Sequence, residues 1–491
     1  MAAVLRLYGR LTRRGIVLLA IGVALYVAVE AISFVQTYPD EASRLRLAEF
    51  GDQPAIRMLQ GIPHAVETVG GFVVWDGGWF LQAIVGIWAI LTASRLLRGE
   101  EDSGRAELVG AAPISSTRVA GAAMAVVLAG CLVAGAAVFA TIVAPSDDVP
   151  GSALFAAGVT GLGLVMAAVT AVAAQLFGVR RRVAVVGAGA LGLAFVLRMV
   201  ANSSDGRAWV SWLTPFGWMD QLRPFGDNNT PVLAVYFLVG GVLFAAALAL
   251  RSRRDLGSAF FAMSGSVRAR PLLLQSPIRF AWRLTWGVLL AWAVGIGLYS
   301  FMIGSLVKSM GEVLADDPAY AQYLEAVGLA KETVIGGMVA VTAILFGLMG
   351  SLYAAWRIGA VRGEEDGERA EHLLTRPLTR GRWLGGHLLL TVVSVLVLVA
   401  VNGSALWFGA EVTGAGLSVS DTLAASANVL PVIVFFGGLA VAMFGVAPRL
   451  TVAVPVGAAV VAYILGFVGP ALNLPAWVLG LSPFYHVALV P

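Results

Sequence analysis

Two stretches of the sequence carry the same ordered set of acids, bases and a proline. Residues 98–121 read RGEEDSGRAELVGAAPISSTRVAG and residues 362–385 read RGEEDGERAEHLLTRPLTRGRWLG, so 11 of 24 positions are identical at a constant offset of 264. A solvated charged loop is the simpler interpretation of one such stretch. Two copies that keep the order of their charges favour a docking surface, because opposite charges on a partner must meet them in register.

We therefore predict that 99–113 and 363–377, which share the pattern GEED-x-x-RAE-x5-P, bind a partner protein. Ala, Leu and Glu favour helix, acids suit the first turn, and the proline ends it. Ser115–Thr117 and Thr379 can cap the helix that follows. The expected element is a charged helix of about 11 residues, roughly 16 Å long, lying across the ends of two membrane spans. Its predicted contact residues are Glu100, Glu101, Asp102, Arg105, Glu107 and Pro113 in the first copy and Glu364, Glu365, Asp366, Arg369, Glu371 and Pro377 in the second.

The sequence contains no phosphate-binding loop of the form G-x-x-x-x-G-K-[ST]. Its two lysines, Lys308 and Lys331, each follow a residue other than glycine. Without that loop the chain cannot hydrolyse ATP by the usual mechanism. We predict that the chain has no catalytic residues and is not an enzyme on its own.

No cofactor or metal site is predicted in this chain. One cysteine, Cys131, excludes an internal disulfide and a cysteine-based metal cluster. The single G-x-G-x-x-G, at 187–192, lies in an apolar stretch, where small residues allow close packing of helices. The histidines lack metal-ligand spacing and are His64, His372, His387 and His486.

The composition points to lipid as the main solvent of this chain. Of the 491 residues, 59% are hydrophobic and 13% are charged, whereas soluble proteins average about 45–50% and about 25%. Apolar stretches long enough to cross about 30 Å of hydrocarbon as a helix recur along the chain. We predict eleven spans, at 15–36, 70–94, 118–144, 152–177, 183–201, 231–250, 284–304, 334–356, 384–408, 422–446 and 451–470.

The distribution of basic residues predicts a cytoplasmic N-terminus. With that orientation, the cytoplasmic segments hold 25 of the 33 basic residues and the external segments hold seven. Positive charge concentrates on the cytoplasmic side of membrane proteins. Both charged repeats then lie in the cytoplasm, each after the second span of its half.

The repeated motifs predict an internal duplication with two parallel halves. Besides the charged stretches, Trp209-Val210 with 213–216 (LTPF) recurs as Trp477-Val478 with 481–484 (LSPF). The predicted organisation is a first six-span half (1–250), an Arg-rich cytoplasmic linker (251–283) and a second half (284–491). Since 35 residues follow Pro215 up to Leu250 and eight follow Pro483, we expect a twelfth span beyond Pro491.

Charges inside the predicted spans are few, and such charges are usually functional. Glu30 and Arg198 each lie 15 residues from the cytoplasmic start of their span, about 22 Å along it. Asp76 lies near the outer end of the second span. Equal depth allows an ion pair between Glu30 and Arg198; alternatively, Arg198 reaches the outer headgroups and Glu30 faces a wet vestibule. We assign both residues to the translocation path.

The charged loops resemble the first intracellular loop of ATP-binding-cassette export permeases of the second type, which reads roughly E-x-x-x-G-x-x-E-L-L-x-x-P-[VI]-[ST]-R. The second copy departs from that pattern at Glu368 and His372, and its register is therefore the less regular. The 209–216 and 477–484 segments resemble the outer re-entrant connection before the last span of that family. The matching loop residues are Glu100, Gly104, Glu107, Leu108, Pro113, Ile114 and Ser115, then Glu364, Glu368, Glu371, Leu373, Leu374, Pro377, Leu378, Thr379 and Arg380.

The resemblance extends to fused two-half permeases similar to actinobacterial tetronasin-like antibiotic exporters. It implies a multi-pass protein of the bacterial plasma membrane whose loops are coupling helices seated on two copies of a separate ATPase. ATP and Mg²⁺ would bind that ATPase. The implied substrate is a small amphiphilic compound, such as an antibiotic, and no nucleic-acid partner is expected.

A second class of protein also builds twelve spans from parallel halves, namely the ion-coupled secondary transporters. Such carriers usually need titratable groups near the midplane, and the second half has none there. A membrane enzyme such as a polyprenyl transferase would need an acidic or histidine cluster, which the sequence lacks. The sequence therefore favours an ATP-driven exporter subunit over an ion-coupled transporter.

Overall fold

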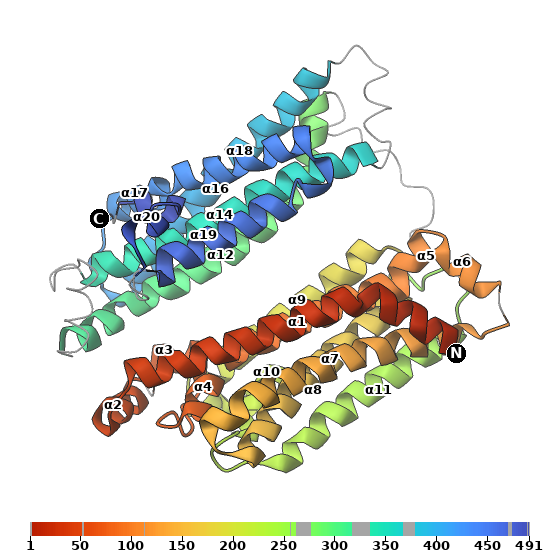
Figure 1. Cartoon of the computed structure of the whole chain (residues 1–491), viewed down its shortest axis with the longest axis horizontal. Coiled ribbons are helices and arrows are strands. Elements are labelled where there is room, and N and C mark those ends of the chain that lie inside the picture. Colours follow the sequence, from red (N-terminus) through yellow and green to blue (C-terminus); the bar gives the residue numbers. More distant parts are fainter. Residues whose placement is uncertain are drawn as a thin grey trace. The chain divides into compact units, whose positions relative to one another are not determined.

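Long helices make up both parts of the chain in the computed structural model, which describes residues 2–51, 54–111, 113–255, 257–261, 276–316, 334–366, 379–469, 474–488 and 490. The chain divides into two compact units, Met1–Val267 and Arg268–Pro491 (Figure 1). Across the described ranges, the β structure amounts to one isolated bridge between Phe177 and Phe261. The protein is therefore an all-α membrane protein with many spans.

Among the described residues of the first unit, six long helices correspond to the six spans predicted there. Short helices cover the end of the unit opposite the N-terminus: α2 (Glu41–Gly51), α3 (Pro54–Gln60) and α10 (Pro215–Leu222). The long helices are α1 (Ala2–Thr37), α4 (Val69–Ser94), α7 (Ser116–Ser146), α8 (Val149–Leu176), α9 (Arg180–Asn202) and α11 (Leu233–Ser252).

Helix α8 forms the centre of the first unit. It packs against α4, α7, α9 and α11, and 78% of its most apolar stretch is buried, more than in any other span. Small residues permit this packing. At Gly161, for example, a Cβ atom would lie 2.7 Å from the ring of Tyr236 on α11.

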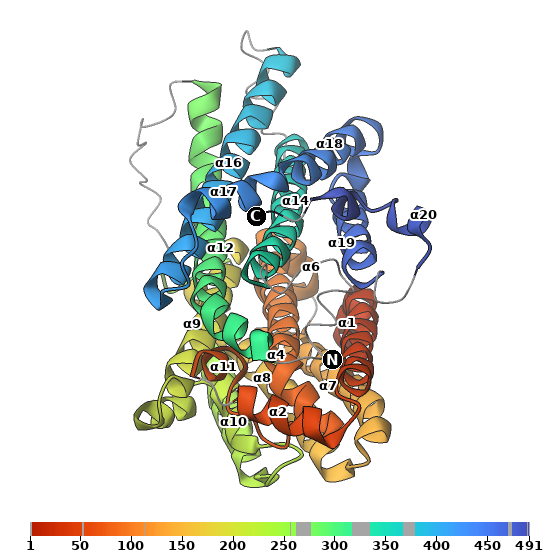
Figure 2. The same cartoon turned by 90° about the vertical axis from the view of Figure 1, so that its left-hand side faces the viewer.

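The second unit is built on a long pair of helices, α12 (Pro277–Asp316) and α16 (Arg380–Thr413), which lie side by side (Figure 2). A Cβ atom on Gly304 or Gly409 would collide with the backbone of the other helix, which explains the small residues at this crossing. The remaining elements are α14 (Val334–Asp366), α17 (Val419–Asn428), α18 (Leu430–Val446), α19 (Ala453–Val468) and α20 (Ala476–Leu479).

Ten helices in the described ranges are long and apolar enough to cross a membrane. They correspond to ten of the eleven predicted spans, and one of the ten, Val419–Val446, is made of α17 and α18 together. The eleventh prediction, 451–470, corresponds to α19, whose 16 residues reach about 24 Å, less than the hydrocarbon thickness of about 30 Å. This helix is therefore shorter than the sequence predicted.

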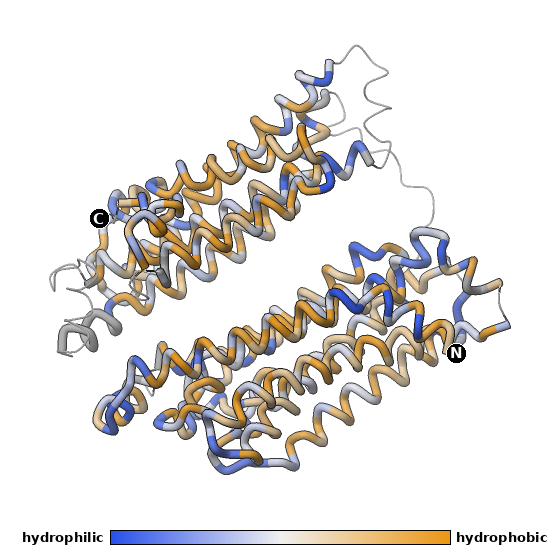
Figure 3. The backbone as a smooth tube through the Cα atoms, in the orientation of Figure 1, coloured by the Kyte–Doolittle hydropathy of each residue, from blue (hydrophilic) through white to orange (hydrophobic). Residues whose placement is uncertain are grey.

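The outer surfaces of the long helices suit contact with lipid. Apolar residues run along these helices, and hydrophilic residues gather towards their ends (Figure 3). Large apolar side chains face outwards in both units, including Leu18, Leu238 and Val434, each at least 64% exposed. Such wide apolar surface is normal for a protein solvated by acyl chains and exceptional for a soluble one.

The duplicated motifs make the same local contacts in both units. Thr214 Oγ1 donates to the Ala194 carbonyl at 2.5 Å, and Ser482 Oγ donates to the Ala462 carbonyl at 2.6 Å. Both pairs are related by 268 positions. The predicted caps are also present: Ser115 accepts from Arg118 N, and Thr379 accepts from Arg382 N.

We expect Thr214→Val to lower the free energy of unfolding by about 1 kcal/mol, because it removes a buried donor while keeping the side-chain shape. Ser482→Ala should lower stability by a similar amount, and Ser252→Ala, at an exposed site, should not. Thermal unfolding in detergent measures all three. Equal effects at the three positions would contradict a special role for the repeated contact.

Candidate functional site

The first acidic stretch continues the second span and does not start a separate helix. After α4, a π-helical turn (Arg95–Gly99) leads directly into α5 (Glu100–Asp102). The predicted single helix over 99–113 is therefore wrong. Gly99 adopts right-handed helical angles, so nothing interrupts the helix before the acids, and Gly104 at φ +72° ends it. A side chain at that φ would be strained.

Beyond this break the chain forms α6 (Arg105–Gly110) and then enters α7. The second copy also continues its span as a helix through the acids, because α14 runs through Glu364 and Glu365 to Asp366. The helix of each second span thus carries its acids beyond the apolar stretch. Arg369, Glu371 and Pro377 lie outside the described residues, as does the side chain of Asp366.

Glu101 lies at the centre of a buried cluster of arginines. Its carboxylate accepts from Arg98 Nη1 at 2.7 Å and from Arg254 Nη1 and Nη2 at 3.0 and 2.7 Å. Arg251 Nη2 lies 3.5 Å from Glu101 Oε1. The side chains of Arg98, Arg254 and Glu101 are 3%, 2% and 7% exposed. One carboxylate therefore neutralises part of the charge of three buried guanidinium groups.

The arginines of this cluster connect segments that are distant in sequence. Arg98 donates to the carbonyls of Gly178 and Ser258 at 2.8 and 2.9 Å. Arg254 donates to Gln175 Oε1 at 3.0 Å and to the Ser258 carbonyl. The cluster thus joins the end of α4–α5 to the ends of α8 and α11. It also shows that the start of the predicted 251–283 linker packs within the first unit.

The other acids of the first copy make separate contacts, and Glu100 is also buried, at 7% exposed. Glu100 accepts both Nε and Nη2 of Arg105, at 2.8 and 3.1 Å, and this pairing raises the pKa of Arg105 above its ordinary value. Asp102 accepts from the backbone N–H of Arg180 at 2.7 Å, at the start of α9. Arg105 has 60% of its side chain exposed, and Leu108 is 79% exposed.

Glu107 and Pro113 are exposed as well. The predicted docking residues of the first copy therefore separate into two groups. Glu101 points into the protein and holds the segment in place. Arg105, Glu107 and Pro113, together with Leu108, form an outward face made of α6 and the turn after it.

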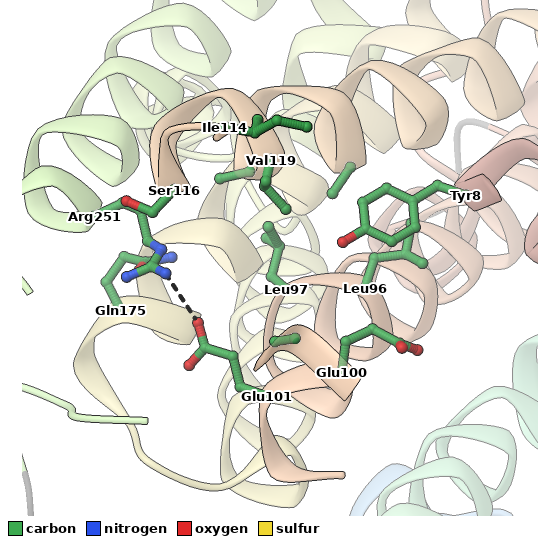
Figure 4. Close-up of a pocket in the computed structure, with 13 residues that line it drawn as sticks. Tyr8, Leu96, Leu97, Glu100, Glu101, Ile114, Ser116, Val119, Gln175 and Arg251 are labelled. Atoms are coloured by element: carbon green, nitrogen blue, oxygen red, sulfur yellow. Dashed lines mark ion pairs between the residues drawn. The ribbon is translucent and has the colours of Figure 1, made fainter. Parts of the chain in front are cut away.

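A pocket of about 160 Å³ lies between this segment and the long helices (Figure 4). Tyr8 and Glu100 lie on one side of it, and Arg251 and Gln175 lie on the other. Its walls are Leu96, Leu97, Ala106, Ile114, Ser116, Val119, Ala120, Ala123 and Glu101, in addition to those four residues. The pocket combines apolar walls with two hydroxyls, an amide, a guanidinium and two carboxylates beside the docking segment.

In the second copy, the acids make fewer contacts that the structure describes. Glu365 Oε2 pairs with Arg362 Nη1 at 3.1 Å, and both side chains are at least 30% exposed. Glu364 Oε2 lies 3.6 Å from Nε2 of His387 on α16. Arg98 and Arg362 occupy equivalent positions in the two repeats. In both repeats, the arginine of R-G-E-E-D thus pairs with the acid three positions later, a contact that the sequence pattern makes predictable. The participation of Arg251 and Arg254 in the first cluster was not predictable from the sequence.

Arg198 pairs with Asp220 and not with Glu30, so the suggested Glu30–Arg198 pair is wrong. Arg198 Nε and Nη2 donate to the two Asp220 oxygens at 2.8 and 2.9 Å. Its other donors meet the carbonyls of Leu59 and Gln60 at 2.9 and 2.6 Å. The short helix α10 places Asp220 beside Arg198 of α9. Nothing in the sequence indicated this contact.

Glu30 instead lies beside Tyr26 of its own helix and Asp76 of α4. Asp76 accepts from Gln60 Nε2 at 2.6 Å. These acids and the Arg198 cluster thus meet near Gln60, at the end of the unit opposite the docking segment. The structure brings Glu30 and Arg198 into neighbouring polar clusters of the first unit without direct contact.

The sequence matches one family along almost its whole length. The family described as multidrug efflux system permease Rv1217c, C-terminal domain, matches residues 1–251 and 274–491. The chain is 32% identical over 492 residues to the multidrug efflux system permease protein Rv1217c of Mycobacterium tuberculosis (strain ATCC 25618 / H37Rv). The alignment covers 99% of this chain and 88% of that protein. With ten apolar helices and this match, the chain belongs to the Rv1217c family of multidrug efflux system permeases.

Proposed function

We propose that this chain is the membrane subunit of an ATP-driven exporter and that its charged segments dock a separate ATPase. The observation that carries this proposal is the division of the first segment into a buried anchor and an exposed face. Glu101 is held by three arginines, while α6 presents Arg105, Glu107 and Leu108 to solvent. Exposed apolar side chains among charges are typical of a surface that binds another protein.

The sequence supports a separate energy source for transport. A chain without a phosphate-binding loop needs either an ATPase partner or an ion gradient. The relative's name describes a permease of a multidrug efflux system. Two repeats of the charged segment suggest two ATPase copies for each chain, with ATP and Mg²⁺ bound to those copies.

Orientation and substrate follow from the same proposal. If the segments meet a cytoplasmic ATPase, the N-terminus lies in the cytoplasm of a bacterial plasma membrane, in agreement with the distribution of basic residues. The substrate would be a small amphiphilic compound, since multidrug permeases act on such molecules through apolar surfaces. Glu30 and Arg198, at the opposite end of the first unit, remain candidates for the translocation path.

Docking is tested by co-purification of the chain with its candidate ATPase. We expect wild type to carry two ATPase copies, and Glu107→Lys with Leu108→Asp to carry one, because the variant puts a base where the acid stood and replaces the exposed apolar side chain with a charged one. Glu371→Lys, at the equivalent acid of the second copy, should also lose one. The control is Glu67→Lys, the same Glu-to-Lys change at an exposed position next to the opposite end of α4.

The control should retain both ATPase copies. If wild type binds no ATPase, or if the control loses as much ATPase as the α6 variant, the docking proposal fails. Glu101 is unsuitable for this test, because any loss of binding would reflect the loss of its internal contacts.

A further inference from the structure

A seam between α14 and α16 contains buried hydrogen-bond donors that the described residues leave without an acceptor. Arg357, Trp383 and His387 are 4%, 5% and 3% exposed. Arg357 Nε and Nη2, Trp383 Nε1 and His387 Nδ1 have no hydrogen-bond partner in the part of the chain described. The first three are N–H donors, and Nδ1 is another when it carries the proton.

These side chains face one another from two helices. Trp383 and His387 are four positions apart on α16, and their ring centroids lie 5.3 Å apart in a T-shaped arrangement. Glu364 approaches the other ring nitrogen of His387, at 3.6 Å. Within the described residues, no carboxylate forms a direct ion pair with Arg357, and Glu364 acts on its guanidinium only from a longer distance.

A buried guanidinium in this condition is costly. Removing an ion from water is unfavourable by several kcal/mol unless hydrogen bonds and an opposite charge replace the lost hydration. Each unmet donor adds a further cost. We therefore expect an acceptor from outside the described residues to bind these donors.

The repeat shows that helix packing does not require these polar groups. At the offset of 264, Arg357, Trp383 and His387 correspond to Ala93, Val119 and Ala123. In the first unit Ala93 is buried, and Val119 and Ala123 line the pocket beside the docking segment. The equivalent helices α4 and α7 thus carry small apolar residues at these positions, two of which line a pocket, whereas α14 and α16 carry hydrogen-bond donors.

The kinds of donor and their depth indicate the ligand. Arginine binds phosphate oxygens through several N–H groups, and an indole N–H can supply one more. Arg357 directly follows the predicted span 334–356, and the neighbouring Trp356 is 39% exposed. Tryptophan gathers at the depth of lipid headgroups, and basic pockets between spans bind anionic lipids there.

We propose that the seam between α14 and α16 binds the phosphate group of a membrane phospholipid. Arg357 and Trp383 donate to the phosphate oxygens. The site belongs to the second unit and has no counterpart in the first.

The test is thermal unfolding of purified, delipidated full-length chain in detergent, with phosphatidylglycerol added. We expect the lipid to raise the Tm of wild type by roughly 5 °C and to have no such effect on Arg357→Gln. The matched control is Arg382→Gln, which removes an exposed arginine from the start of α16 and should keep the shift. An equal shift with inorganic phosphate would support a phosphate site that is filled from solution.

A second variant covers the case in which Arg357→Gln fails to fold. Trp383→Phe keeps an aromatic ring but removes the N–H, and we expect it to weaken phosphatidylglycerol binding by about tenfold. A wild-type lipid shift in both variants would overturn the proposal. It would also be overturned if Arg357→Gln lowered the Tm of the delipidated chain as much as that of the lipid-bound chain, because an internal acceptor would then satisfy the donors.

Discussion

Glu101→Gln is expected to lower the free energy of unfolding of the first unit by about 3–5 kcal/mol, because it removes the carboxylate that three buried arginines share, while Asp102, 3.4 Å from Arg98, compensates only one of them. Arg98 and Arg254 lie within 3.0 Å of this carboxylate, and Arg251 lies 3.5 Å away. Glutamine keeps the shape of the side chain but not its charge. The π-helical turn that carries Arg98 and the end of α11, with Arg251 and Arg254, would then repel each other.

Glu100→Gln is the matched control for this change. It neutralises the adjacent carboxylate, which is buried at 7% exposed but whose partner Arg105 is 60% exposed, so the change leaves no buried cation without its counter-charge. Thermal unfolding in detergent should show a large decrease for Glu101→Gln and little change for Glu100→Gln. Similar stability of the two variants would show that the arginine cluster does not depend on Glu101.

The second large effect is expected at the opposite end of the same unit. Asp220→Asn should destabilise this unit by about 3–5 kcal/mol, because Arg198 would lose its bidentate partner while buried. Arg198 is 4% exposed. After the substitution, its remaining full-strength acceptors would be the carbonyls of Leu59 and Gln60. Those carbonyls supply no negative charge.

Asp227→Asn provides the control for Asp220→Asn. Asp227 also pairs with an arginine, Arg223, but its side chain is 75% exposed, so the change should have little effect. Unfolding of both variants in detergent distinguishes the two cases. A further variant, Glu30→Gln, should leave the Arg198 pair intact, and a loss equal to that of Asp220→Asn would restore the original Glu30–Arg198 hypothesis.

Much of the fold could be predicted because lipid imposes a simple rule on sequence. A helix that crosses hydrocarbon needs about 20 apolar residues, and ten of the eleven predicted spans correspond to long helices. The caps at Ser115 and Thr379 were also predictable, since they depend on local sequence alone. The prediction for 451–470 overestimated α19, because hydropathy does not show where a helix ends.

The sequence could not predict which acid pairs with which arginine, because these pairs depend on tertiary contacts. Glu101 and Arg254 are 153 positions apart, and Arg198 and Asp220 are 22 apart. Equal depth suggested Glu30 as the partner of Arg198, but depth does not specify which helices are neighbours. The duplicated R-G-E-E-D pattern identified the important segment, although it could not separate the buried acid from the exposed face.

That separation changes the way in which the charged segments are interpreted. A buried Glu101 fixes α5 to the ends of α8 and α11, so a force applied to the outer face of α6 would be transmitted to those helices through the cluster. Weakening the cluster should reduce transport even where the exposed face still binds its partner. Docking and transmission can therefore be altered by different substitutions.

The most direct test of an ATP-driven exporter is transport in proteoliposomes that contain this chain with its candidate ATPase. A fluorescent amphiphilic compound would be followed after ATP is added, with an ion gradient alone as the second condition. We predict accumulation that requires both ATP and the ATPase and that is reduced by Glu107→Lys with Leu108→Asp. Accumulation driven by an ion gradient in vesicles that lack the ATPase would contradict the proposed function and identify an ion-coupled transporter.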